Sequence, residues 1–554
     1  MQMNTEEVPK PSNVDADPVR TWGRLPSDST RAKLTLFGST GALVTGMRAT
    51  GVLQQHGRSR PVRRQAAEQP AVREGRAGLE GKSERPIVPK KPGNAGGGKG
   101  PWFKGDARRS KGKEIGVSLI TPESVWQLQE ALHAKAKREP ACRFHSLYDK
   151  LYRKDMLWHA WRCCRANGGA PGVDGVSFRQ IEREGVNGWL EGLAKELQEK
   201  TYRPQAVRRV WIPKPGSDKQ RPLGVPCIKD RVAQMAAVIV LEPIFEADLP
   251  EEQYGYRHGR SAHDAIRTIH GLLNQGHREV VDCDLSGYFD SIPHAQLVKS
   301  AARRISDGAM LALIKAWVQM PVEEEDGHGG KRRTTVAKDS GRGTPQGAPI
   351  SPLLSNLYMR RFVLGWKKLG WEEKLKARLV VYADDFVILC RGNAVEAKKQ
   401  MQAIMSTLKL TVNEQKTRIC RVPQESFDFL GYTIGQCYSP RNGRAFIGTR
   451  PSDKRVSAVC QTISHMTRRD SYWKPVGEKV EELNRTLRGW GNYFCLGAVS
   501  RAYRAVDNHV RHRLRQWLNG KHRSQGVHPV RQAPMYLHRK LGLLRLATTT
   551  GNRS

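Results

Sequence analysis

Two short acidic segments carry the residues best suited to chemistry. The segment Val380 to Leu389 reads VVYADDFVIL, in which Asp384 and Asp385 separate two runs of β-forming residues. This pattern predicts a β-hairpin with both carboxylates at its turn. Adjacent carboxylates could hold a divalent metal ion that binds phosphate oxygens. Aspartates are also common in turns because they bond their own backbone, so this segment alone is weak evidence.

The second acidic segment, Val280 to Ile292, reads VVDCDLSGYFDSI. As a strand it would point Asp282 and Asp284 to the same face, because side chains alternate along a strand. The spacing alone does not say which of the two would reach a metal ion. A strand edge with solvated carboxylates is the alternative interpretation.

Two loops could bind the rest of a phosphate-bearing substrate. Gly343 to Asn356 reads GTPQGAPISPLLSN, and its glycines and prolines predict a tight loop followed by a helix that Ser351 caps. Ile212 to Pro226 reads IPKPGSDKQRPLGVP, a turn whose basic residues are suited to gripping phosphate. Taken singly, the first could merely cap a helix and the second could be an ordinary exposed basic loop.

The composition favours a nucleic-acid partner. The 554 residues carry a formal net charge of +39, and the pI is about 10.1. Such an excess of positive charge is typical of proteins that bind polyphosphates. In a metabolic enzyme the same excess would be energetically costly. The sequence has no apolar run of membrane-spanning length, no signal-peptide core and no C-x-x-C pair. We therefore expect a cytoplasmic protein with reduced cysteines, no zinc site and no membrane partner.

The order of the motifs resembles the order found in one protein family. The series resembles the reverse transcriptases of bacterial group II introns, the intron-encoded maturases, from about residue 118 to residue 545. Eight motifs in the same order carry this resemblance, which a lone YADD could not do. In chain order they are NGGAPGVDG (Asn167 to Gly175), the basic turn, YGYRHGRSAHDAI (Tyr254 to Ile266), DLSGYFD (Asp284 to Asp290), PQGAPISPLLSN, YADD, LTVNEQKT (Leu410 to Thr417) and FLGY (Phe429 to Tyr432).

The resemblance implies an α+β fold of the right-hand polymerase type. The fingers and palm would combine an antiparallel palm sheet with helices, and the thumb, which is the maturase domain X, would be helical. We expect five segments, which are a basic leader without stable structure (1–116), a helical N-terminal extension (117–172), the fingers and palm (173–440), the thumb (441–518) and a basic tail (519–554) that could touch target DNA.

The resemblance also implies roles for individual residues. Asp284, Asp384 and Asp385 match the carboxylates that hold two Mg²⁺ ions, and the backbone at Leu285 belongs to the same metal site. Phe289 matches the ring that excludes a ribose 2′-hydroxyl, although it could simply be core. Lys416 lies in a motif close to the incoming nucleotide, although it could simply be a solvated lysine. The other matches are Lys214 and Arg221 (triphosphate), Gln346 (nucleotide), Gly347 (template) and Tyr382 (primer). His263 is expected to be a structural hydrogen-bonding residue.

The C-terminal part has two apolar stripes at helical spacing, which predict packed helices. A cluster of arginines lies beside the second stripe, and an arginine face next to aromatic residues suits structured RNA. A helical bundle with a solvated basic surface is the alternative. The stripes are Leu483, Leu487, Trp490, Tyr493 and Phe494, then Val506, Val510, Leu514 and Trp517; the arginines are Arg504, Arg511, Arg513 and Arg515.

The expected function is RNA-directed DNA synthesis together with binding of group II intron RNA to assist splicing and mobility. Its partners would be the intron RNA, an RNA template, a DNA primer or target, and deoxynucleoside triphosphates. The alternatives are a domesticated reverse transcriptase in defence or repair, and an RNA-binding splicing cofactor without polymerase activity. No cysteine follows Trp517, so we expect no His-Asn-His endonuclease of the zinc-supported kind.

Overall fold

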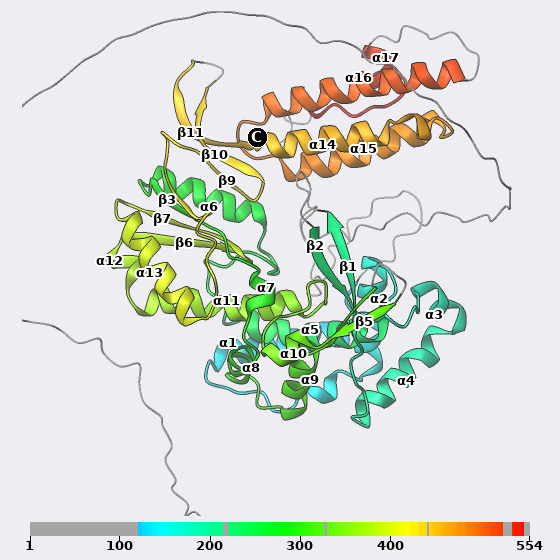
Figure 1. The fold of residues 1–554 in the computed structure, drawn as a ribbon, viewed down its shortest axis with the longest axis vertical. Helices are drawn as coiled ribbons and strands as arrows, with labels where there is room; N and C mark the ends of the chain where they lie inside the picture. The colour runs from blue at the N-terminus through cyan, green and yellow to red at the C-terminus, as the bar shows by residue number, and fades with distance from the viewer. Residues whose placement is uncertain (1–119, 214–219, 326–329, 440–441, 525–533, 548–554) are drawn as a thin grey trace, which may run out of the picture. The chain divides into compact units, whose positions relative to one another are not determined.

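The fold mixes α-helices with mostly antiparallel sheets, an α+β architecture as the sequence predicts (Figure 1). The structure, a computed structural model, describes residues 120–213, 220–325, 330–439, 442–524 and 534–547. The expected leader (1–116) and Lys214 lie outside the described residues, as does part of the expected tail. No helix among the described residues is both long and apolar enough to cross a membrane.

The elements follow one another in three groups. The first group is α1 (Glu123–Arg138), η1 (Tyr148–Lys150), α2 (Lys154–Asn167), α3 (Phe178–Glu184), α4 (Val186–Gln198), β1 (Val207–Pro213), β2 (Gln220–Val225) and α5 (Ile228–Glu246). The second is α6 (Ala262–Asn274), β3 (Glu279–Cys283), α7 (Tyr288–Ser291), α8 (His294–Ala302), α9 (Gly308–Val318), β4 (Val322–Glu325), β5 (Lys331–Thr334), α10 (Val336–Ser340), α11 (Ser351–Lys368), α12 (Trp371–Lys374), β6 (Ala377–Tyr382), β7 (Asp385–Cys390), α13 (Ala394–Thr407) and β8 (Arg418–Arg421). The third is β9 (Phe427–Phe429), β10 (Tyr432–Tyr438), β11 (Ala445–Pro451), α14 (Asp453–Met466), η2 (Arg469–Ser471), α15 (Val476–Tyr493), α16 (Ser500–Ser524) and α17 (Pro534–Arg539).

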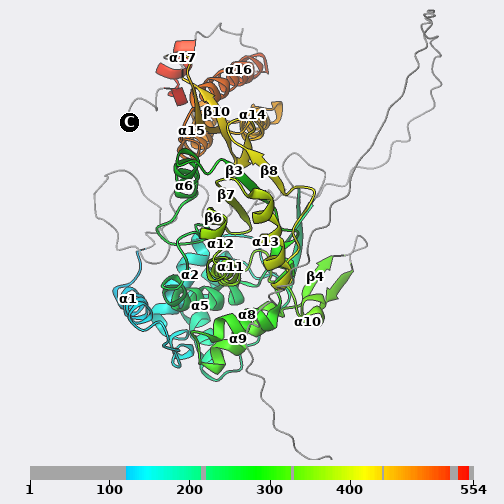
Figure 2. The same ribbon diagram turned by 90° about the vertical axis from the view of Figure 1, so that its left-hand side faces the viewer.

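The central sheet has the strand order β6-β7-β3-β8, and every neighbouring pair is antiparallel. One face packs on α11 and α13 (Figure 2), where the rings of Phe386 and Phe362 lie 5.1 Å apart. The other face packs on α6, so that Val380 and Val387 join a second core with Ile266. Because both faces are covered by apolar side chains, the strands are held in one register and their ends are fixed in space.

Helix α6 begins with a complete capping box, which explains the SAHD sequence at its start. The Ser261 side chain accepts a hydrogen bond from the Asp264 backbone, and the Asp264 side chain accepts one from the Ser261 backbone. Such a box satisfies two backbone N–H groups that would otherwise lack a partner. The helix is thereby placed firmly across the central sheet.

A second sheet, β2-β1-β4-β5, combines the antiparallel hairpin β1–β2 with β4, which runs parallel to β1. Arg221 lies opposite Ile212 in this hairpin. The base of the hairpin, at Val207, joins the core of a helical layer built around α5, which is buried on almost every side. The segment expected to be a helical N-terminal extension (117–172) contains α1 and α2, which both pack on α5.

The helices α14, α15 and α16 form a bundle with a core of its own. Both apolar stripes predicted from the sequence are confirmed: Leu483 and Leu487 of α15 meet Val506, Val510 and Leu514 of α16, and all five are buried. Trp517 continues the second stripe and is fully buried. The bundle and the central sheet are connected through the small sheet β11-β10-β9.

Tyr493, at the end of α15, connects the bundle to the central sheet. His263 Nε2 of α6 donates a hydrogen bond to the Tyr493 backbone oxygen (2.5 Å), and the Tyr493 hydroxyl donates one to the Leu430 oxygen (2.9 Å). The rings of His263 and Tyr493 lie 5.6 Å apart. His263 is therefore a structural hydrogen-bonding residue, as predicted.

The expected N-cap role of Ser351 is wrong. Ser351 is the first residue of α11, Ile350 stands at the cap position, and no side chain caps this end. The Ser351 hydroxyl instead donates a hydrogen bond to the Pro345 oxygen (2.8 Å), which closes the preceding loop. The sequence pattern misplaced the helix start by one residue, because a serine that closes a loop looks like a serine that caps a helix.

Candidate active site

The hairpin β6–β7 places two carboxylates at its tip. Tyr382 pairs with Asp385 across a turn made of Ala383 and Asp384. Ala383 is buried and has a φ of 59°, the left-handed conformation that tight hairpin turns require and that side chains other than glycine adopt at a cost. Asp385 is exposed and Asp384 is half-buried, so both carboxylates can reach a ligand at the tip.

The pairing of β3 with β7 separates the two acidic residues of the upstream segment. Cys283 pairs with Phe386, so Asp284 comes next to Asp385 at the open end of the sheet. Asp282 pairs with Val387, one step deeper, and forms an ion pair with Arg418 (3.6 Å). Burial raises the pKa of Asp282 to about 6, against the opposing effect of Arg418. Of the two acids, Asp284 is the one that lies beside the hairpin tip.

The Leu410 to Thr417 segment holds Asp284 from the other side. The Asn413 amide and the Lys416 ammonium each donate to Asp284 Oδ2 at 3.1 Å. The Asn413 backbone N–H donates to the Asp284 backbone oxygen (2.8 Å), and Leu285 forms an isolated β-bridge with Val412. The backbone around Asp284 and Leu285 is therefore fixed, while the Lys416 side chain remains 66% exposed.

The Gly343 to Asn356 loop joins the turn after β3 to the hairpin β1–β2. Gln346 Nε2 donates to Asp290 Oδ2 (3.0 Å), and the Gln346 oxygen accepts from the Gly224 N–H of β2 (2.7 Å). Gly347 has a φ of 114°, and a Cβ there would lie 2.6 Å from the Gly224 oxygen. Only glycine allows this approach between the two backbones. Burial raises the pKa of Asp290, against the effects of Arg209 and the Gln346 hydrogen bond.

Phe289 is held between these segments. Its backbone oxygen accepts a hydrogen bond from the Thr344 N–H (2.7 Å), and its ring packs edge-on to Tyr288 at 5.7 Å. Tyr288 is buried and its hydroxyl donates to the Ser355 oxygen (2.7 Å). The Phe289 ring is only half-buried, so one part of it faces away from the core.

The Tyr254 to Ile266 segment contributes a tyrosine that sequence reasoning missed. Gly255 packs against the hairpin turn so closely that a Cβ would lie 2.5 Å from the Ala383 nitrogen, and Asn356 Nδ2 donates to its oxygen (2.7 Å). The next residue, Tyr256, has a φ of 55°. Burial, then the charge of Asp384, raises the pKa of Tyr256 to about 12.

Tyr256 lies within the electrostatic influence of both tip carboxylates, and Arg221 of the hairpin β1–β2 acts on it in the opposite sense. The signal that could have found it was its place in the YGYRHGRS motif, next to a glycine. The sequence carried no sign of what that glycine packs against.

The remaining predicted residues fall in two places. Arg221, Gln346, Gly347 and Lys416 lie on segments that the contacts above connect to the hairpin tip or to its neighbours, and Tyr382 lies at the tip itself. The four arginines lie apart from them on α16, where Arg511 bonds to the Asp507 oxygen (3.2 Å). Arg513 is engaged with the end of α14, through the Ser464 oxygen (3.0 Å) and the Thr467 oxygen (3.2 Å).

The donor set at the tip has the chemistry that Mg²⁺ prefers, namely carboxylate and backbone oxygens. Among the described residues, however, no group of three or more His, Cys, Asp or Glu side chains is close enough to hold a metal ion. One oxygen of Asp284 is bonded to Lys416 and Asn413 instead. The acids meet at one end of the sheet, and their side chains would have to turn slightly to share an ion.

Comparisons with known proteins agree with this arrangement. A family model described as reverse transcriptase (RNA-dependent DNA polymerase) matches residues 212–434, and one described as group II intron, maturase-specific domain, matches residues 456–534. Protein YkfC of Escherichia coli (strain K12) is 32% identical over 368 residues, which are 60% of this chain and 93% of that protein.

The group II intron-encoded protein LtrA of Lactococcus lactis subsp. cremoris is 29% identical over 442 residues, which cover 64% of this chain and 71% of LtrA. Among solved structures, a chain of a partial Cas6-RT-Cas1–Cas2 complex is 24% identical and has a TM-score of 0.30. That match covers 48% of this chain and 43% of the other, and so low a score supports no argument about shape.

Proposed function

The chain belongs to the family of group II intron reverse transcriptases and maturases, and we propose that Asp284, Asp384 and Asp385 form its polymerase site. It is an RNA-directed DNA polymerase with a maturase domain. The proposal rests on the register of β3 and β7, because this pairing brings Asp284 beside Asp385 while Asp282 lies two residues deeper in the sheet. Polymerases of this kind depend on divalent metal ions, and here we propose two Mg²⁺ ions.

The metal ions, when bound, would lower the pKa of the attacking primer hydroxyl and neutralise the charge that develops on the leaving pyrophosphate. The three carboxylates and the backbone oxygen at Leu285 would hold them. Lys416 forms an ion pair with Asp284, and its exposed side chain would turn towards an incoming triphosphate. Arg221 would bind the same triphosphate from the hairpin β1–β2.

Four residues would position the reacting groups. Phe289 would lie beneath the sugar of the nucleotide, because its backbone is fixed by Thr344 and part of its ring is exposed. Gln346 and Gly347 would support the templating pair, since their loop is tied both to the turn after β3 and to β2. Tyr382, at the hairpin tip, would pack near the primer end.

We also propose that the bundle α14–α16 binds group II intron RNA through an arginine face. Arg504, Arg511 and Arg515 recur on one side of α16, since residues three to four apart share a helix face. Guanidinium groups in a row suit the phosphates of a structured RNA. Arg513 fits this role less well, because its guanidinium already bonds to the end of α14.

Primer extension by single-site variants tests the polymerase site. Asp284→Asn should abolish extension of a DNA primer on an RNA template, because a metal-holding carboxylate is lost. Asp282→Asn is the matched control, since it makes the same chemical change on the same face of the strand, and most of the activity should remain. Loss of activity in Asp282→Asn with retention in Asp284→Asn would overturn the proposal.

Binding of the cognate intron tests the arginine face separately. Reversing the charge at Arg511 and Arg515 should weaken intron binding and make its salt dependence shallower, because phosphate contacts are lost. The control is charge reversal at Arg179 and Arg183, two exposed arginines one turn apart on α3. Unchanged intron affinity in the α16 variant would assign that face a structural role only.

A further inference from the structure

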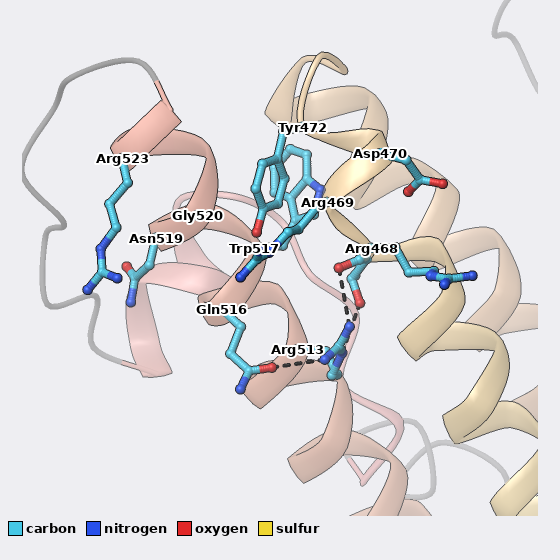
Figure 3. A pocket seen from close by; sticks show the side chains of 11 residues that line it. Arg468, Arg469, Asp470, Tyr472, Arg513, Gln516, Trp517, Asn519, Gly520 and Arg523 are labelled. Carbon is cyan, nitrogen blue, oxygen red and sulfur yellow. Dashed lines mark hydrogen bonds between the residues drawn. The ribbon is translucent and has the colours of Figure 1, made fainter. Parts of the chain in front are cut away.

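A large open pocket lies between the end of α14 and the C-terminal half of α16 (Figure 3). Its volume is about 1110 Å³, slightly more than the roughly 300–1,000 Å³ of small-molecule sites. Four guanidinium groups and one carboxylate line it, so its charge is strongly positive. The lining residues that matter here are Arg468, Arg469, Asp470, Tyr472, Arg513 and Arg523.

Three of these arginines are available to a ligand. Arg468, Arg469 and Arg523 are exposed, and none of them has a side-chain hydrogen bond or ion pair to any residue that the structure describes. Arg513, in contrast, is half-buried and bonds to Gln516 (3.0 Å) and to the end of α14. Arg513 therefore forms the floor of the pocket, and the other three form its charged rim.

An exposed indole follows the pocket wall in the chain. Trp473 is 70% exposed, which is unusual for so large an apolar ring, and the Lys474 ammonium lies 5.7 Å from its centre. Its neighbour Tyr472 is held in place, because its ring packs edge-on to buried Trp517 at 6.1 Å and its oxygen accepts from Lys521 (2.6 Å). The segment that presents Trp473 is thus anchored at the residue before it.

Gly520 shows how tightly this segment is fitted to α16. A Cβ at Gly520 would lie 1.9 Å from the Tyr472 hydroxyl, so any larger residue would displace the tyrosine. Trp517 Nε1 adds a hydrogen bond to Ser471 Oγ (2.9 Å). The pocket is therefore a built feature of the bundle, with its aromatic wall fixed against α16.

The pocket faces away from the arginine face of the proposed function. At about 100° per residue, Gly520 lies roughly opposite Arg511 and Arg515 around the axis of α16, and Arg523 lies about 80–120° from them. The pocket is also remote from the junction with the central sheet. Tyr503 lies near the start of α16, the end that follows Tyr493 in the chain, and Arg523 follows it by 20 residues, which is about 30 Å of helix. A ligand here would leave both the polymerase site and the first arginine face accessible.

We propose that this pocket binds an unpaired strand of RNA, with phosphates on Arg468, Arg469 and Arg523 and a base stacked on Trp473. The proposal rests on the proposed function, since the whole pocket lies within the region that matches the maturase-specific domain. An unpaired strand fits better than a duplex, because a base can stack on an exposed ring only when it is not buried in a helix. The bundle would then hold two RNA segments, one on each side of α16.

Fluorescence anisotropy with a labelled unstructured RNA oligonucleotide, using the full chain, tests the pocket. Arg468→Glu with Arg469→Glu should lower affinity at least tenfold and make the salt slope shallower by about 1.4, because each of the two lost single-strand contacts contributes about 0.7. Trp473→Ala should lower affinity about tenfold with an unchanged salt slope, since it removes stacking and not charge. Trp473→Phe should recover most of that loss.

The controls separate this inference from the proposed function. Arg179→Glu with Arg183→Glu makes the same charge change on α3 and should leave the affinity within about twofold of the wild type. Extension of a short primer on a generic template should be unchanged in the pocket variants. If the wild-type protein could not extend this primer, that result would count against the polymerase proposal alone. Three results would overturn the pocket proposal: an equal loss in the α3 control, no loss in Trp473→Ala, or an equal dependence on these residues for single-stranded DNA or for duplex RNA.

Discussion

The ring of Phe289 gives a direct test of how the site would select its nucleotide. Its backbone is fixed by Thr344 and its ring is only half-buried, so truncation would open space at the surface of the site and would hardly disturb the core. Phe289→Ala should therefore raise the incorporation of ribonucleotides relative to deoxynucleotides, by about tenfold or more if one steric contact provides the discrimination. Single-nucleotide incorporation with each substrate measures this ratio.

Phe289→Tyr is the matched variant, because it keeps the ring and should retain discrimination. If Phe289→Ala leaves the ratio unchanged while the protein stays folded, Phe289 is a core residue and not a gate. Neither variant touches the carboxylates at the hairpin tip, so both should keep polymerase activity with deoxynucleotides.

At the scale of single residues, the sequence predicted the positions of the acidic residues better than it predicted the positions of the residues around them. The hairpin with Asp384 and Asp385 at its tip follows from local pattern alone, since β-forming runs on both sides of a turn define it. The spacing of Asp282 and Asp284 did not choose between them, and only the family resemblance favoured Asp284; the register of β3 with β7, which no local pattern contains, now gives a physical reason for that choice. Tyr256 depends on a contact between Gly255 and Ala383, residues far apart in the chain, and could not be read from spacing.

Among the elements, the end of α14 depends on a residue of α16. Arg513 donates to the Ser464 and Thr467 backbone oxygens and to the Thr467 hydroxyl at the helix end, where the last carbonyl groups have no intrahelical partner. Arg513→Ala should lower the free energy of unfolding by about 1.5–3 kcal/mol, because hydrogen bonds to a charged group are lost. Urea unfolding measures the difference.

Arg504→Ala provides the comparison on the same helix. Arg504 is exposed and makes one backbone contact, so its removal should change stability by no more than about 0.5 kcal/mol. Equal effects of the two substitutions would mean that the contacts of Arg513 do not hold α14 and α16 together.

The elements themselves were predicted unevenly. The helices α1, α2, α15 and α16 follow from apolar residues at helical spacing, and their buried faces agree with that pattern. The start of α11 was misplaced, because the role of Ser351 depends on its contact with Pro345. The parallel pairing of β1 with β4 joins segments more than 100 residues apart, so no sequence pattern could have predicted it.

For the molecule as a whole, a buried histidine should limit stability in acid. His159 of α2 is 1% exposed, and burial, assisted by Arg162, lowers its pKa to about 4. An unfolded chain would bind the proton near pH 6.5, so between these values only the unfolded state is protonated. The contribution of neutral, buried His159 to the free energy of unfolding is therefore complete above pH 6.5. It is lost as the pH falls from 6.5 towards 4.

His159→Gln should remove this dependence. Between pH 6.5 and pH 4 the wild type should lose about 1–3 kcal/mol more unfolding free energy than the variant, since each pKa unit corresponds to about 1.4 kcal/mol. The comparison uses the change with pH and not the absolute stability, which the substitution also alters. Parallel pH profiles of the two proteins would exclude His159 as the cause.

For the whole molecule, we propose a polymerase site on the central sheet and a separate RNA-binding bundle beyond it. Primer extension by Asp384→Ala tests this account most directly. Because Asp384 stands in the hairpin turn, its loss should remove metal-holding charge without disturbing either core, and the rate should fall by at least ~10³-fold. Binding of intron RNA should persist in the same variant. A protein that lacks the Asp384 carboxylate and still extends a DNA primer at the wild-type rate would contradict the account.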